Sequence, residues 1–195
     1  MAEGNRPPLV AVLAAGSASR FGGGKLDAML AGKPVGQYVL DAVAQAGLGH
    51  GLIVVPSNAP HFAENSGWPL ITNINASDGL GTSLALAASA ALAQSRALLV
   101  LLADMPLITA SHIGDLLASG ELAATIYPDG KAGVPAYFPV DTLEKLRLWT
   151  GEGGAGRFLN SQRQLRRIPA KEEWLVDVDR PVDIARAEEI LSQRG

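Results

Sequence analysis

A glycine-rich loop with two basic residues follows the first apolar segment of the chain. Residues 13–26 read LAAGSASRFGGGKL and include Arg20 and Lys25. Glycine and alanine let backbone N–H groups approach phosphate oxygens without side-chain clashes, and the two cations offset the negative charge that builds up during phosphoryl or nucleotidyl transfer. We therefore expect residues 16–25 to wrap a triphosphate rather than to form only a flexible turn.

This loop differs from two common phosphate-binding loops. A Walker A loop needs Ser or Thr directly after its lysine to ligate the metal ion, but Lys25 is followed by Leu26. A dinucleotide-binding loop that used Gly22 and Gly24 would need its third glycine where Asp27 stands. The sequence thus argues against a P-loop NTPase and against a nicotinamide-dependent dehydrogenase.

Carboxylates stand at two other places where the chain is expected to leave or enter a regular element. Asp104 follows the uninterrupted apolar run 97–103, which is typical of a strand buried on both faces of a parallel sheet. Asp179 lies just before Pro181, which suits the first turn of a helix, and Asp177 is its nearest rival. Both carboxylates also have a structural interpretation, because Asp104 suits a turn and Asp179 suits a helix N-cap.

Apolar strands alternate with helices along most of the chain. Strands are expected at 9–13, 51–55, 70–72, 97–103, 122–127 and 134–138. Helices are expected at 35–46, at 82–94, from a cap at Thr109 or Ser111 to about 117, at 143–149 and from 181 onward, with loops at 73–81 and 151–156. This alternation predicts a three-layer α/β/α fold with a mostly parallel sheet, in a single domain over residues 1–195.

Composition and charge exclude several classes of partner and site. The formal net charge of -3 offers no general attraction for nucleic acid or for an anionic membrane. The chain has no cysteine, which excludes disulfides, thiolate metal sites and a cysteine nucleophile. We find no signal peptide and no apolar run long enough to span a bilayer. We expect a cytoplasmic protein that binds neither nucleic acid nor membranes.

The loop at 13–26 resembles the N-terminal signature L-A-A-G-x-x-x-R-[FM]-G-x-x-K-L of MobA-like nucleotidyltransferases, and most of all that of molybdenum cofactor cytidylyltransferases. Further segments resemble the family in the same order: LAGKP at 30–34, the loop at 73–83, ADMP at 103–106, GVP at 133–135 and DVDRP at 177–181. The resemblance covers nearly the whole chain. It implies a Rossmann-like nucleotidyltransferase fold in which the nucleotide lies across the carboxyl ends of the first strands.

The resemblance also implies roles for individual residues. The residues that it places at the nucleotide are Leu13, Ala14, Ala15, Gly16, Lys25, Asn73, Gly79 and Ser83. It makes Lys25, Arg20 and Asp104 the catalytic residues, the two cations holding phosphates and the aspartate binding Mg²⁺. Asp179 is implied as the second metal ligand, with Asp177 still open. Asn73 and Ser83 keep their alternative interpretations as a turn residue and the start of a helix.

Specificity is implied less directly, and several positions depart from the family pattern. Ala15, where guanylyltransferase relatives have glycine, favours CTP. Ala85 and Val134 stand where a basic residue and a histidine are common, which leaves the acceptor open. Residues 151–157 resemble the late family loop G-D-x-G-A-R, but Glu152 replaces its aspartate and an additional glycine displaces Arg157. The role of that loop is left open.

The chemistry that the resemblance implies agrees with these residue types. An acceptor phosphate is ionised near neutral pH and attacks the α-phosphorus without a strong general base, so no catalytic histidine is required. The implied reaction joins CTP to molybdopterin and releases pyrophosphate, and a molybdoenzyme would receive the product. A sugar 1-phosphate or another small phosphorylated acceptor is the enzymatic alternative. A non-catalytic module that binds a nucleotide or cofactor and delivers it to a partner is the alternative from a different class.

Overall fold

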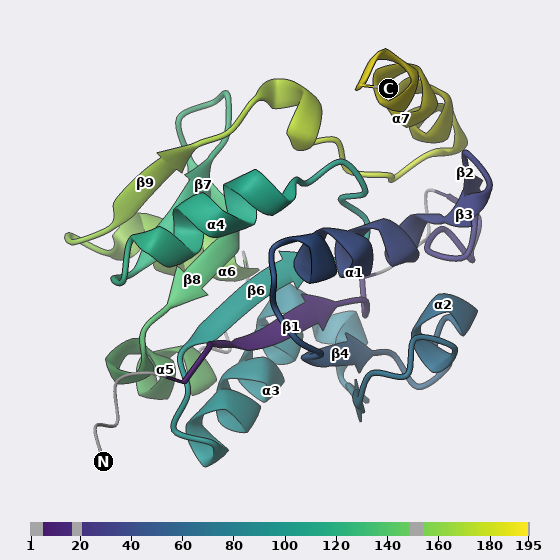
Figure 1. Ribbon diagram of the computed structural model, residues 1–195. Helices are drawn as coiled ribbons and strands as arrows, with labels where there is room; N and C mark the ends of the chain where they lie inside the picture. Colours follow the sequence, from purple (N-terminus) through teal and green to yellow (C-terminus); the bar gives the residue numbers. More distant parts are fainter. Residues whose placement is uncertain (1–5, 17–20, 149–153, 195) are drawn as a thin grey trace.

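The computed structural model describes residues 6–16, 21–148 and 154–194 (Figure 1). Its strands are β1 (Leu9–Leu13), β2 (Met29–Leu30), β3 (Lys33–Pro34), β4 (Leu52–Val55), β5 (Leu70–Thr72), β6 (Leu98–Leu102), β7 (Ala123–Ile126), β8 (Ala132–Phe138) and β9 (Arg166–Pro169). Its helices are α1 (Val35–Gln45), α2 (His61–Glu64), α3 (Leu80–Ala93), α4 (Ala110–Ala118), α5 (Val140–Arg147), α6 (Gly154–Ser161) and α7 (Pro181–Arg194), with short 3₁₀ turns η1 (Ala76–Asp78) and η2 (Glu172–Trp174). Among the helices of these residues, none is long and apolar enough to cross a membrane.

Seven of these strands form one sheet in the order β5-β4-β1-β6-β8-β7-β9, and β2 pairs with β3 in a separate hairpin. In the sheet, β8 runs antiparallel to both of its neighbours, while the other pairs are parallel. The chain builds outward from β1 through β4 to β5 and then returns to the other side of β1 as β6. Open α/β sheets bind ligands at the carboxyl ends of the strands at such a switch point. The expectation of a mostly parallel sheet is confirmed.

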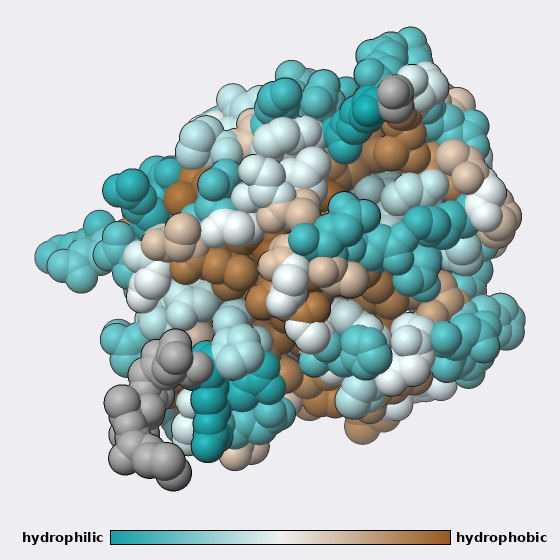
Figure 2. Space-filling view, in the orientation of Figure 1, coloured by the Kyte–Doolittle hydropathy of each residue, from teal (hydrophilic) through white to brown (hydrophobic). Residues whose placement is uncertain are grey.

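Helices cover both faces of the sheet. In Figure 1, α1, α4 and α7 lie in front of the sheet, and α3, α5 and α6 lie behind it. Along β1, Val10 and Val12 belong to the front core, whereas Leu13 belongs to the core behind, as the alternation of side chains along a strand requires. In the same orientation, polar residues cover the outer surfaces of the helices and apolar residues are seen between them (Figure 2). The three-layer α/β/α fold is confirmed.

Four elements were not expected from the sequence: the β2–β3 hairpin, α2, α6 and β9. Helix α6 starts at Gly154, so the loop expected at 151–156 is wrong from that residue on, and residues 151–153 lie outside the described part of the chain. Glycine disfavours helix, but Phe158 and Leu159 of α6 are buried in the core behind the sheet. Packing of this apolar face thus outweighs local propensity.

Several expected boundaries also move. The helix expected at 143–149 runs from Val140 to Arg147, and α3 begins at Leu80, directly after Gly79, instead of at 82. Gly79 has a φ of 104°, a backbone conformation that favours glycine and ends the preceding loop. Thr109 rather than Ser111 caps α4, because its hydroxyl accepts a hydrogen bond from the His112 N–H at 3.2 Å.

His112 is a fully buried titratable residue in the first turn of α4. Its Nε2 lies 2.8 Å from the Thr125 hydroxyl oxygen, and that hydroxyl donates its own proton to the Pro135 carbonyl at 2.7 Å. The hydroxyl must therefore accept from the ring, which assigns the proton to Nε2. Burial lowers the pKa of His112 from its ordinary value of 6.5, an effect that nearby Asp115 opposes. The folded protein thus favours the neutral ring.

The stability of the fold should therefore fall in mild acid. A histidine with a lowered pKa in the folded state leaves stability intact above the unfolded value of about 6.5 and removes it as the pH falls below that value. We expect the free energy of unfolding, measured with urea, to drop more between pH 7.5 and pH 5 in the wild type than in His112→Gln, whose amide can still donate to Thr125. The matched substitution His50→Gln, at an exposed position, should leave the wild-type slope. Equal slopes in all three proteins would contradict this role of His112.

Candidate active site

One lysine ammonium is held between two carboxylates at the carboxyl end of the sheet. Lys25 Nζ donates to Asp104 Oδ2 at 2.7 Å and to Asp179 Oδ1 at 3.0 Å. The side chain of Lys25 is 5% exposed, while those of Asp104 and Asp179 are 20% and 48% exposed. Burial by itself lowers the pKa of Lys25, but the two carboxylates outweigh it and the net pKa is raised. The ammonium is therefore charged at neutral pH.

The sheet brings Lys25 and Asp104 together. Neighbouring strands β1 and β6 are parallel and end in register, with Leu13 opposite Leu102. One residue further, the Ala103 N–H donates to the Leu13 carbonyl at 3.0 Å. The loop that carries Lys25 and the turn that carries Asp104 therefore leave the sheet side by side, at the switch point.

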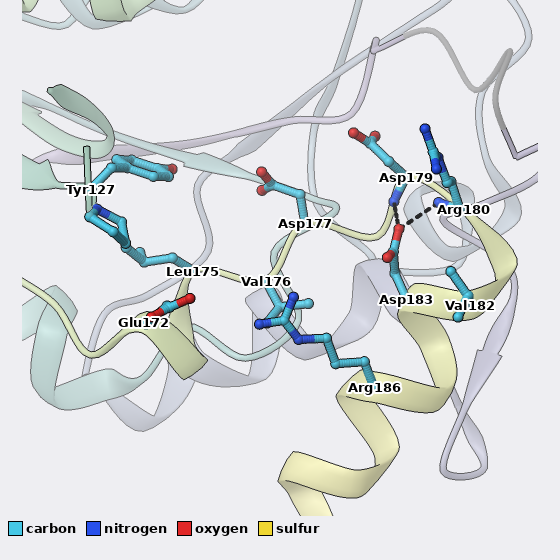
Figure 3. Close-up of a pocket in the computed structure, with 11 residues that line it drawn as sticks. Tyr127, Glu172, Leu175, Val176, Asp177, Asp179, Arg180, Val182, Asp183 and Arg186 are labelled. Atoms are coloured by element: carbon cyan, nitrogen blue, oxygen red, sulfur yellow. Dashed lines mark hydrogen bonds between the residues drawn. The ribbon is translucent and has the colours of Figure 1, made fainter.

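Backbone hydrogen bonds position Asp179. The Val178 N–H donates to the Asp104 carbonyl at 2.9 Å, which ties the segment before α7 to the end of β6. Asp183 Oδ2, in the first turn of α7, accepts from the N–H groups of Asp179 at 2.9 Å and Arg180 at 2.7 Å (Figure 3). This is the carboxylate half of a capping box, and it satisfies amides that the helix leaves unpaired. It holds the backbone of Asp179 while Oδ1 bonds to Lys25.

Asp177 lines a cavity of about 460 Å³ together with Asp179 and Tyr127. In Figure 3 its carboxylate turns toward Tyr127, whereas Asp179 lies nearer to α7. Asp177 is exposed to the cavity, yet protein groups surround its carboxyl group. Burial raises the pKa of Asp177 to about 7, with further contributions from the charges of Asp104 and Asp179 and opposition from Lys25. Of the two rival aspartates, Asp179 is the one hydrogen-bonded to Lys25.

The predicted triphosphate loop borders a second cavity, of about 580 Å³. Ala14, Gly16, Gly24 and Lys25 line it, facing Asn58 and other residues that follow β4. The side chains of Leu13 and Ala15 are buried, so any contact they make with a nucleotide would come through the backbone. Arg20, the second predicted cation, lies outside the described residues.

The structure brings Asn73, Gly79 and Ser83 together, but at the start of α3 rather than on the wall of the Lys25 cavity. Asn73 Nδ2 donates to the hydroxyl of Ser83 at 2.8 Å and to that of Thr82 at 2.9 Å, and its Oδ1 accepts from the Asn75 N–H at 3.0 Å. Asn73 also lines a separate cavity, of about 490 Å³, that includes Ala85. These bonds account for Asn73 as a turn residue, and a role in nucleotide binding stays a prediction.

The sequence analysis did not identify Asp183, Tyr127 or Thr82, which the structure places at or near these cavities. Asp183 had a usable signal, since an acidic residue at the third position of a helix that begins with proline is typical of a capping box. Tyr127 had none, because the hydrogen bond from its hydroxyl to the Val134 carbonyl, at 2.6 Å, depends on the pairing of β7 with β8.

The carboxylates of Asp104 and Asp179 are the candidate ligands for a metal ion at this centre. Within the described part of the chain, no group of three or more His, Cys, Asp or Glu residues could hold one. Asp104 and Asp179 nevertheless converge on one cation, the Lys25 ammonium. Two carboxylates completed by water and phosphate oxygens are a usual donor set for Mg²⁺ in phosphoryl-transfer sites.

Comparisons with known proteins give consistent matches. Residues 10–167 match the model of the MobA-like NTP transferase domain. The chain is 31% identical over 184 residues to the "Probable molybdenum cofactor guanylyltransferase" of Opitutus terrae, covering 89% of this chain and 91% of the relative. It is 29% identical over 170 residues to the purine catabolism protein PucB of Bacillus subtilis, covering 80% and 82%. A solved nucleotidyl transferase from Methanothermobacter thermautotroptrophicus superposes with a TM-score of 0.78 at 20% identity, covering 95% and 98%.

Removing the ammonium should leave two facing carboxylates without their counter-ion. We expect Lys25→Met to lower the free energy of unfolding by roughly 1–3 kcal/mol, less than for a fully buried pair because solvent reaches Asp179. Added Mg²⁺ should restore part of the loss in the variant and change the wild type less. Thermal melts with and without Mg²⁺ test this, with Lys145→Met on α5 as the control. A stability equal to that of the wild type would contradict the bridge.

Asp183 should matter through its hydrogen bonds to the backbone. Asp183→Ala removes the acceptor for two N–H groups, so we expect a loss of about 1 kcal/mol in the free energy of unfolding. Asp183→Asn keeps an acceptor oxygen and should lose less. Urea unfolding of both variants, with Glu189→Ala on the same helix as the control, measures the difference. If Ala and Asn at position 183 had the same effect, the capping role would be wrong.

Proposed function

The chain belongs to the MobA-like NTP transferase family, and on that premise we propose that it transfers a nucleoside monophosphate from CTP to the phosphate of molybdopterin and releases pyrophosphate. The observation that carries this proposal is the convergence of Lys25, Asp104 and Asp179 at the switch point of the sheet, beside the glycine-rich loop. Positive charge, paired carboxylates and open backbone amides are what this transfer requires.

Molybdopterin is proposed as the acceptor because the resemblance and the Opitutus terrae relative point the same way. That relative is named a probable molybdenum cofactor guanylyltransferase and aligns along nearly the whole chain. Its name also favours GTP as a second candidate for the nucleotide. We keep CTP first because Ala15 stands where guanylyltransferase relatives have glycine. PucB, whose name refers to purine catabolism, favours retaining other phosphorylated acceptors as an alternative.

In the proposed reaction, an oxygen of the acceptor phosphate attacks the α-phosphorus of the nucleotide in line. The new P–O bond forms as the bond to the bridging oxygen of the β-phosphate breaks, and pyrophosphate leaves. Backbone N–H groups at Ala15 and Gly16 would hold the triphosphate, since the Ala14 N–H donates to the Val54 carbonyl at 2.8 Å. Lys25, which lines the same cavity, would offset the charge on its phosphates. The nucleophile is ionised beforehand, so none of the three histidines is needed as a base.

Mg²⁺ is proposed as the metal, held by Asp104 and Asp179. The fit rests on donor type and convergence, since both carboxylates reach the same cation within hydrogen-bonding distance. When bound, the ion would neutralise charge on the triphosphate. Asp183 would keep Asp179 in place for this role through its bonds to the backbone. The product would then be a dinucleotide form of the cofactor, suited to delivery to a molybdoenzyme.

Pyrophosphate release with each of the four ribonucleoside triphosphates, in the presence of Mg²⁺ and either molybdopterin or a panel of sugar phosphates, tests the proposal. We expect release with CTP and molybdopterin. Lys25→Ala and Asp104→Ala should each lower kcat by roughly 10²-fold or more, the scale of losing one preorganised charge in a reaction centre. Lys145→Ala, remote and exposed, should react like the wild type.

The other outcomes assign different functions. Release with GTP and molybdopterin would replace the base, and release only with a sugar phosphate would replace the acceptor while keeping the mechanism. Tight nucleotide binding without release under any condition, unaffected by Asp104→Ala, would favour the delivery module and overturn the enzymatic proposal.

A further inference from the structure

Helix α2 and the residues before it form one wall of the cavity of about 580 Å³ beside the glycine-rich loop. Gly24 and Lys25 line one side of this cavity, and the segment 56–64, which includes Asn58 and Pro60, lines the other. This segment runs from the end of β4 into α2, and Figure 1 shows α2 on the same side of the molecule as the start of α1 and the β2–β3 hairpin. The position of the segment therefore sets the width of the cavity.

Helix α2 cannot hold this position by itself. It has four residues, His61–Glu64, and an isolated helix of that length is unstable in water. The residue before it, Pro60, offers no side-chain acceptor that could cap the helix. The first N–H groups of α2 therefore need an acceptor from elsewhere in the chain.

Asp27 supplies that acceptor from the opposite wall. Its Oδ2 accepts from the His61 N–H at 2.9 Å, and its Oδ1 accepts from the Phe62 N–H at 2.7 Å. Asp27 follows Lys25 by two residues, and its own N–H donates to the Gly24 carbonyl at 3.1 Å. One carboxylate thus joins the two walls of the cavity.

A second contact fixes α2 from the side of α1. The side chain of Phe62 is 4% exposed, and its ring packs against Gly36 so closely that a Cβ atom at position 36 would lie 2.5 Å from Cε1 of the ring. The Gly36 N–H in turn donates to the carbonyl of Leu26, the residue after Lys25, at 2.9 Å. The loop contacts α2, α2 contacts α1, and α1 contacts the loop. These three contacts close a ring, so moving α2 changes its relation to Lys25.

We propose that Asp27 is a positioning residue for nucleotide binding, which acts by holding α2 and the segment 56–64 against the loop that carries Lys25. Asp27 needs no contact with the nucleotide for this role. Its carboxylate is engaged by two N–H groups, and a negative charge at this place would by itself repel a triphosphate. The inference rests on the proposed function, because it takes this cavity as the nucleotide site.

The direction of the effect separates positioning from charge. Asp27→Ala removes a negative charge from the cavity, which by itself would tighten the binding of a polyanion. We expect it instead to raise the KM of CTP about tenfold, equivalent to about 1.4 kcal/mol of binding free energy. Asp27→Asn, which keeps one acceptor oxygen, should raise it less. Glu64→Gln removes a charge from the same cavity without uncapping α2, so it should leave the KM of CTP unchanged or lower it.

The other kinetic constants show whether the effect is confined to the nucleotide. In Asp27→Ala, kcat and the KM of molybdopterin should stay within about twofold, because Lys25 keeps its bonds to Asp104 and Asp179. A raised KM with an unchanged kcat reports lost binding that the ground state and the transition state share. General damage to the fold would change all three constants.

A second substitution moves α2 without changing any charge. Gly36→Ala places a Cβ atom where the Phe62 ring lies, so the ring must shift and the KM of CTP should again rise. Gly114→Ala is the matched control, since a Cβ at that position of α4 would meet nothing within 4 Å. Urea unfolding of each variant verifies that the assays use folded protein.

A binding measurement keeps the inference separate from the proposed function. Isothermal titration calorimetry with Mg²⁺ uses whichever of the four ribonucleoside triphosphates binds the wild type most tightly. If this nucleotide binds but no acceptor is turned over, a weaker Kd in Asp27→Ala and in Gly36→Ala sustains the role of Asp27, although the proposed reaction fails. If none of the four binds the wild type, the inference falls together with the proposed function.

Two further results would overturn the inference while leaving the proposed function intact. In the first, Asp27→Ala binds the nucleotide as tightly as the wild type or more tightly, or Gly36→Ala has no effect on binding. In the second, Asp27→Ala lowers kcat with an unchanged KM of CTP, which would mean that Asp27 acts on the reaction centre and not through α2.

Discussion

An ammonium group shared by two carboxylates requires three distant parts of the chain to meet at one point. Lys25 comes from the loop after β1, Asp104 from the turn after β6 and Asp179 from the segment before α7. Burial of Lys25 is tolerated because both partners are present, since an unpaired buried charge is costly. The order of the strands, the crossover back to β6 and the tie between Val178 and Asp104 all serve this one contact. The contact fixes the Lys25 end of the glycine-rich loop against both carboxylates.

The same contact organises the charges around it. One cation faces Asp104 and Asp179, while Asp177 stands close enough for its pKa to be raised to about 7 by burial and by those two carboxylates. Four acids and two arginines line the cavity on the side of α7, and Lys25 lines the cavity on the side of the loop together with Asp27 and Glu64. The acid-rich cavity beside α7 would bind an anionic phosphate only with help from Lys25 or a divalent cation.

Where sequence and structure differ, the cause is packing or pairing that no local pattern records. Helix α6 contains glycines and forms because Phe158 and Leu159 reach the core behind the sheet. Strand β9 has mostly exposed side chains, so it lacks an apolar pattern, and its backbone pairs with β7. Asn73 and Ser83, expected at the nucleotide, bond to each other at the start of α3. A polar residue that follows a strand can serve the ligand or the loop itself, and only its partners distinguish the two.

By itself, the sequence determined the alternation of strands and helices, the glycine-rich loop with Lys25 after a buried strand, and a carboxylate at the end of another buried strand. These follow from residue type and local spacing, which one stretch of chain displays on its own. Only the tertiary structure decided that Asp179, rather than Asp177, bonds to Lys25 and that Asp183 holds the backbone of Asp179. It also decided that a cavity opens beside Tyr127 and Asp177. The physical reason is separation along the chain. Lys25 lies 79 residues from Asp104 and 154 from Asp179; the sheet brings Lys25 and Asp104 together, and the backbone bond from Val178 to Asp104 adds Asp179.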